Sequence, residues 1–179
     1  MSEKQSVIRP QDIVVLLKRI TPSGRSMNGK ELAKSLGMSP AEISLSMARS
    51  RNARLTDSSN SINLLSLKEF LIHGIRYCFP AQPGRLVRGV VTGASASPIN
   101  TMLVPNGEMF VWKDSAGTVR GQAITPLYPS VTKAVKNDLA LYEFLSIVDS
   151  LRIGRARERE VATEVLTKMF DEYARNRKQ

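Results

Sequence analysis

Residues 28–51 constrain the fold more than any other stretch, because stop, turn and start signals for two helices fall within this one window. Leu32, Ala33 and Leu36 recur at helical spacing, and Ala33 is small enough to let a second helix cross closely. Gly37 follows where the first helix must end in a left-handed backbone conformation, which glycine adopts at little cost. The window therefore predicts two short helices joined by a tight turn.

The second helix of this pair has its own start signal. Ser39 can cap it, Pro40 suits its first position, and Glu42 can complete a capping box. Ile43 and Met47 form its buried stripe. The pattern is typical of a helix-turn-helix, whose second helix enters the DNA major groove. An ordinary helical hairpin in a globular core is the alternative, and the capping box and the arginines that follow favour the first interpretation.

The charge balance indicates a polyanionic partner. The chain has 179 residues with 26 Lys and Arg against 16 Asp and Glu, a formal net charge of +10. Such a charge attracts nucleic acid at long range. An anionic membrane surface is a weaker candidate, because no long basic face lacks acidic residues. A merely soluble basic protein is the remaining alternative on charge alone.

The composition also argues against several classes of site. One cysteine can form neither an intramolecular disulfide nor a structural zinc site, and Cys78 and His73 are spaced for packing rather than metal binding. We expect no metal and no cofactor. The chain shows no phosphate-binding loop, carboxylate pair or nucleophile motif, so we expect no enzyme, with carboxylate- or lysine-based chemistry left as the alternative. The start does not resemble a signal peptide, and no apolar stretch reaches the ~20 residues that span a bilayer. A cytoplasmic protein without a membrane partner is expected.

The chain divides into three segments, predicted as a DNA-binding domain over 1–79, a middle segment rich in loops and strands over 80–130, and a helical region over 131–179. The expected fold class is mainly α with a small β component. In the first segment a helix opens at Pro10, and short strands over 54–56 and 62–64 flank a turn, an arrangement typical of a wing. A helix with an apolar stripe that includes Cys78 follows.

In the middle segment we expect short strands over 86–91, 109–112 and 118–120, with a hairpin loop over 114–117 between the last two. Trp112 is interpreted as a packing residue rather than a base-stacking platform, since no other aromatic residue lies at a matching spacing.

The last segment predicts two helices, 139–151 capped by Asp138 and 155–173 after Gly154. Both have wide apolar faces, from which we predict a dimer interface. Residues 1–8 and 175–179 are expected to be tails.

The window 31–49 resembles the DNA-reading segment of winged-helix bacterial transcription regulators of the broad MarR-like kind, and the resemblance extends over about residues 10–65. It implies a symmetric dimer that places two recognition helices in successive major grooves, with wings at the flanking minor grooves. Carried over to this chain, the groove-facing positions are Ser39, Ala41, Glu42, Ser44, Leu45 and Arg49, and the wing tip is Ser58, Ser59 and Asn60.

The side chains suggest a division of roles at that interface. Arg49 can reach a guanine edge, Glu42 is either a second long reader or a cap, and Ala41 and Leu45 can pack on a thymine methyl group. Lys30, Arg51 and Arg54 are expected to hold phosphates. The predicted function is a sequence-specific, dimeric regulator of transcription that binds double-stranded DNA, most simply a repressor that occludes a promoter. The alternative is an antitoxin or adaptor with a DNA-binding head that neutralises a protein partner encoded nearby.

Overall fold

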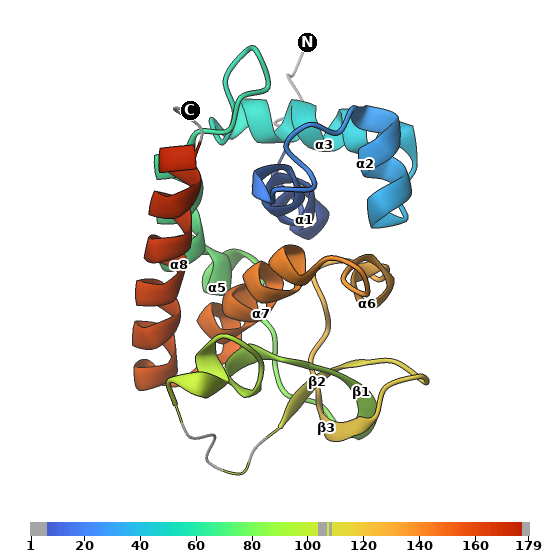
Figure 1. The fold of residues 1–179 in the computed structure, drawn as a ribbon, viewed down its shortest axis with the longest axis vertical. Helices are drawn as coiled ribbons and strands as arrows, with labels where there is room; N and C mark the ends of the chain where they lie inside the picture. The colour runs from blue at the N-terminus through green and yellow to red at the C-terminus, as the bar shows by residue number, and fades with distance from the viewer. Residues whose placement is uncertain (1–6, 104–106, 108, 177–179) are drawn as a thin grey trace.

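The computed structural model describes residues 7–103, 107 and 109–176, and its fold is mainly helical with a small three-stranded sheet (Figure 1). The predicted tails lie largely or partly outside these residues. None of the helices in the described ranges is long and apolar enough to cross a membrane. The elements are α1 Pro10–Ile20, α2 Gly29–Leu36, α3 Pro40–Asn52, α4 Leu64–Glu69, a π-helical turn Phe70–Gly74, α5 Ile75–Cys78, β1 Leu86–Thr92, short 3-10 turns Gly93–Ser95 and Ile99–Thr101, β2 Phe110–Lys113, β3 Val119–Ala123, α6 Val131–Ala134, α7 Leu139–Ile153 and α8 Ala156–Asn176.

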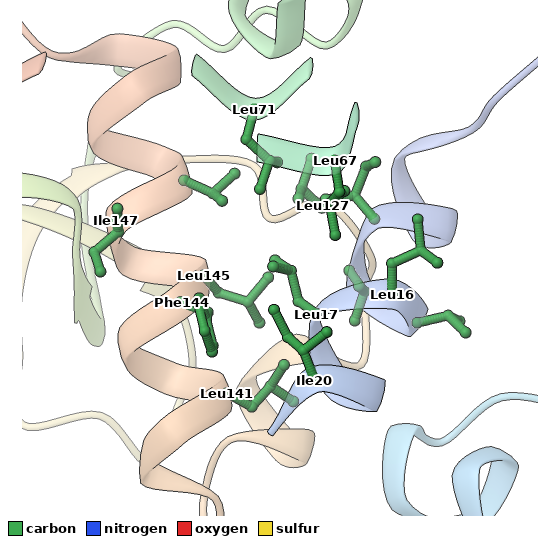
Figure 2. Packing of buried hydrophobic residues seen from close by; sticks show 14 of the residues in the cluster. Leu16, Leu17, Ile20, Leu67, Leu71, Leu127, Leu141, Phe144, Leu145 and Ile147 are labelled. Carbon is green, nitrogen blue, oxygen red and sulfur yellow. The ribbon is translucent and has the colours of Figure 1, made fainter. Parts of the chain in front are cut away.

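Helix α1 is the centre of the molecule and is buried almost all the way round. It lies between α3 on one side and α7 on the other (Figure 1). Figure 2 shows Leu17 and Ile20 of α1 facing Leu141 and Leu145 of α7. A helix buried on most sides must have partners on most sides, and burying each of its Val, Leu and Ile side chains contributes about 1.5–3 kcal/mol.

A single hydrophobic cluster runs from Ile13 to Phe170 and includes Trp112 and Leu127 from the middle segment. All three segments predicted as domains therefore contribute to a common core. Polar contacts reinforce this junction, since the Lys18 ammonium donates to the Asp138 carboxylate, which also caps α7 as predicted.

The apolar faces of α7 and α8 are covered within the chain, so the reason for predicting a dimer interface is wrong. Ile147 of α7 and Leu166 of α8 are fully buried. Phe144 and Phe170 pack edge to face with ring centroids 6.0 Å apart. The helices themselves are confirmed, but α1 and the segment α4–α5 supply the apolar partners that the sequence did not reveal.

The segment that follows residue 63 is a helix with a π-helical interruption. It begins at Leu64, where the Asn63 side chain accepts a hydrogen bond from the Ser66 amide at 3.2 Å. The π turn inserts an extra residue into the helical repeat and shifts the faces beyond it. Ile75, just beyond this turn, keeps its predicted buried place, whereas Cys78, predicted to lie on the same buried stripe, is exposed at the end of α5.

The three strands close on one another, with β1 antiparallel to both β2 and β3 and with β2 and β3 parallel. The three predicted strands are confirmed with small shifts of their ends, but the predicted hairpin over 114–117 is wrong. Gly89 pairs with Lys113 on one edge of β1 and with Val119 on the other, so the loop carries the chain across β1.

Close backbone approach at this crossing requires glycine. A Cβ at Gly89 would lie 2.0 Å from the Trp112 carbonyl oxygen, and one at Gly117 would lie 2.4 Å from the backbone of Gly89. The sheet is thus built around two glycines that the sequence pattern did not distinguish from those of an ordinary loop.

A buried carboxylate joins the sheet to α7. The Asp149 carboxylate accepts hydrogen bonds from Trp112 Nε1 at 2.6 Å, Thr92 Oγ1 at 2.8 Å and Arg152 Nη1 at 2.7 Å. Burial raises the pKa of Asp149, and the Arg152 charge and the three donors oppose that shift. Trp112 is 1% exposed, which confirms its interpretation as a packing residue.

Candidate nucleic-acid interface

The predicted turn between α2 and α3 is present, and α2 is bounded by a capping box that was not predicted and by the predicted Gly37. The Asn28 side chain accepts from the amides of Lys30 and Glu31, and Glu31 accepts from the Asn28 amide at 2.7 Å. Gly37 ends α2 with φ of +62°, as its position predicted. These local bonds define where the first helix starts and stops.

Helix α3 starts where expected, but only one of the two hydrogen bonds of the predicted capping box is formed. The Ser39 hydroxyl accepts from the Glu42 amide at 3.1 Å. The Glu42 carboxylate does not bond back to the Ser39 amide; it accepts from Arg49 Nη2 at 2.6 Å and Gln11 Nε2 at 3.1 Å. Partial burial raises the pKa of Glu42, but the bonds from Arg49 and Gln11 outweigh it and leave the pKa below its usual 4.5.

Arg49 does not face the solvent, contrary to its predicted groove-facing position. The residue is 6% exposed. Its guanidinium forms a bidentate pair with the Asp12 carboxylate, at 2.8 Å from Nε and 2.6 Å from Nη2. Asp12 is fully buried, and a buried carboxylate needs such a partner. Hydrogen bonding to Asp12 raises the pKa of Arg49, against the opposing effect of burial.

The solvent face of α3 is made of short side chains. Ser39, Ala41, Ser44 and Leu45 are exposed, as predicted, whereas Glu42 is only half exposed. Ala48 and Asn52 also lie on this face, and sequence reasoning missed both. Since Ala48 is one turn beyond Ser44 and two turns beyond Ala41, continuing that helical spacing was the signal for it.

A groove of about 720 Å³ lies beside this face, between α3, the start of α2 and the end of α1. Lys30 and Arg51, both predicted phosphate contacts, line it together with Ser44. Arg19 also lines the groove and was not predicted, because no local feature marks it within the largely apolar sequence of α1.

The predicted wing is smaller than expected. Its two strands reduce to one bridge between Thr56 and Ile62, so the predicted ranges 54–56 and 62–64 are wrong in extent. Arg54 has a positive φ of 58°, and the chain turns at Asn63 to cap α4, which leaves no room for longer strands.

The turn itself is well ordered by hydrogen bonds. The Asp57 carboxylate accepts from the amide of Ser59 at 2.8 Å and from its hydroxyl at 2.6 Å, while Ser58 is exposed. Arg51 Nη2 donates to Asn60 Oδ1 at 2.6 Å, so the end of α3 is tied to the predicted wing tip.

Cations gather on the side of the molecule that carries α3 and the turn. A second hollow of about 250 Å³, lined by Arg19, Arg25 and Asn60 among others, lies between the turn and the end of α8. With Lys30, Arg51 and the exposed Arg54, these side chains border α3 and the turn. Such a surface is electrostatically suited to a phosphate backbone.

Comparison of the chain with protein-family models, curated proteins and solved structures finds no match in any of the three. Within the described ranges no three His, Cys, Asp or Glu side chains gather in a way that could hold a metal ion.

Proposed function

We propose that residues 10–65 are a winged helix-turn-helix and that the chain is a sequence-specific regulator of transcription that binds double-stranded DNA. The observation that carries this proposal is the exposed face of α3. Its side chains are short, and Lys30 and Arg51 border it on one side. A helix with such a face fits the floor of a major groove, while the flanking cations reach the phosphates.

The contacts around α2 refine which groups would hold phosphate. The Asn28–Glu31 capping box already occupies the amides of Asn28, Lys30 and Glu31. The Lys30 ammonium is therefore the main phosphate-binding group at this end. Arg51, held by Asn60, is the corresponding group at the end of α3, with Arg54, Ser58 and Ser59 beside it on the turn. Occlusion of a promoter by such a complex is the simplest form of regulation.

The adaptor alternative draws on the middle segment, which is rich in proline and glycine, and on apolar faces in the C-terminal helices. Those faces are buried by α1 and by each other in the described structure. No observation favours that alternative here. The same burial also removes the reason for proposing a dimer through these helices.

The test is binding of the full chain to duplex DNA from its own promoter region across a series of salt concentrations. Affinity should fall with salt with a log–log slope of about −0.9 per phosphate contact. Arg51→Ala should weaken binding to all sequences and reduce the slope by about one contact. Arg157→Ala is the matched control, since Arg157 is exposed in the first turn of α8, the end remote from α3 in Figure 1.

Retention of wild-type affinity and slope by Arg51→Ala would contradict the proposed interface. Equal losses in Arg51→Ala and Arg157→Ala would also contradict it, because they would indicate a response to net charge alone. Absence of any salt-sensitive binding to duplex DNA would overturn the proposed function itself.

A further inference from the structure

Two long polar side chains in the body of α3, Glu42 and Arg49, are held against α1 or against each other. Arg49 is paired with Asp12 and Glu42, and Glu42 also accepts from Gln11. Arg49 is buried and does not reach the exposed face, and Glu42 is held toward Arg49 and Gln11 through its Oε1 atom. Before Arg51, which is tied to Asn60, the helix has no other arginine and no glutamine, and the exposed Asn52 follows only at its last position.

The face that remains is apolar at its centre until the last position of the helix. At about 100° per residue, Ala41, Ala48 and the final Asn52 lie in the middle of the exposed arc, with Ser44 and Leu45 on its two flanks. Leu45 is 55% exposed and is the largest apolar side chain on this face. A leucine is not informative merely because it is exposed, since Leu65 and Leu139 are exposed too. Its place on a face bordered by Lys30 and Arg51 is what singles it out.

The base pairs differ in what they offer to such a face. Guanine, adenine and cytosine are read in the major groove by Arg or Lys, by Asn or Gln, and by Asp or Glu respectively. Thymine alone among the four presents a methyl group, which is read by apolar contact. Side chains of alanine at the centre of the face also let the helix backbone approach the base pairs closely.

We propose that α3 reads the C5 methyl groups of thymine, with Leu45 as the main specificity-determining residue and with Ala41 and Ala48 permitting close approach. This inference rests on the proposed function. The Asp12–Arg49 pair acts as a positioning contact that holds α3 against α1, so that the face is presented in one orientation.

The experiment starts from a random-sequence duplex pool from which the full wild-type chain selects its preferred sites. Each thymine of a selected site is then replaced singly by deoxyuridine, which removes only the methyl group. We expect a loss of about three- to fivefold in affinity at each contacted position, the effect of one buried methyl group. At the position that Leu45 contacts, Leu45→Ala should bind the thymine and uracil duplexes equally. Leu139→Ala changes another exposed leucine, remote in sequence from α3, and should keep the wild-type difference.

The outcomes separate this inference from the function on which it rests. Selected duplexes that bind tightly but show no loss with uracil would overturn methyl recognition and leave DNA binding standing. A uracil effect that persists unchanged in Leu45→Ala would overturn the assignment to Leu45. Failure of the wild-type chain to enrich any duplex would overturn both. An unchanged melting temperature in the two variants establishes that lost contacts, not lost folding, produce the result.

Discussion

Two regions of the molecule each contain a buried carboxylate paired with an arginine, and the two pairs are built differently. Between α1 and α3, Asp12 holds Arg49, whose Nη2 also donates to a second carboxylate, Glu42. Between the sheet and α7, Asp149 holds Arg152, whose Nε donates to the carbonyl oxygen of Phe79 and whose Nη1 donates also to that of Thr125.

The difference shows what each pair contributes. The Asp12–Arg49 pair joins two helices that already pack through apolar side chains, and it removes an arginine from a surface where DNA is expected. The Asp149 cluster joins β1, β2 and α7 through side chains, and Arg152 adds two backbone segments. The first pair mainly orients a helix, whereas the second connects several otherwise separate parts of the chain.

The largest effect is expected from Asp149→Ala. The change leaves Arg152 buried without its carboxylate and leaves the donors of Trp112 and Thr92 unpaired, so the free energy of unfolding should fall by about 3–5 kcal/mol. Urea denaturation measures it, with Asp171→Ala on the exposed side of α8 as the control. A loss no greater than that of the control would contradict the conclusion that the Asp149 cluster connects several parts of the chain.

Arg49→Ala should cost somewhat less, about 3 kcal/mol, because Asp12 loses a charged partner but keeps the amide of Arg9 as a donor at 2.8 Å. The double variant Asp12→Ala with Arg49→Ala should be less destabilised than the sum of the two single variants. Additive losses would show that the two side chains do not act as a pair.

Gly89→Ala should destabilise the sheet by about 1–3 kcal/mol, since a methyl group there collides with the backbone of Trp112. Gly29→Ala is the matched change in the helical region, where a Cβ meets nothing within 4 Å. It should be nearly neutral in the same thermal or urea unfolding measurement. Similar losses at both glycines would contradict the observed strand crossing.

The smallest effect is expected from Glu42→Gln and depends on pH. Because the folded state lowers the pKa of Glu42 below 4.5, the carboxylate stabilises the fold above that value. This contribution, about 1 kcal/mol, is lost as pH falls through the lowered folded pKa. The stability difference between wild type and Glu42→Gln should thus be present at neutral pH and shrink in acid. A difference that does not vary with pH would show that the charge of Glu42 is not involved.

Local signals in the sequence were enough to predict several elements. The cap at Ser39, the left-handed Gly37 and the cap at Asp138 each involve residues within a few positions of one another, so their geometry depends little on the rest of the fold. The buried stripe of α1 and the packing role of Trp112 were also predicted correctly, although distant residues supply the partners that bury them.

Only the tertiary structure decided the role of Arg49, the parallel course of β2 and β3, and the cover of the apolar faces of α7 and α8. Asp12 lies 37 residues before Arg49, and no local pattern links them. The strand order depends on which edge of β1 each strand pairs with. The close backbone crossing at Gly89 determines that choice. An apolar helix face has the same sequence pattern whether its own chain or another molecule covers it, because burial depends on distant partners.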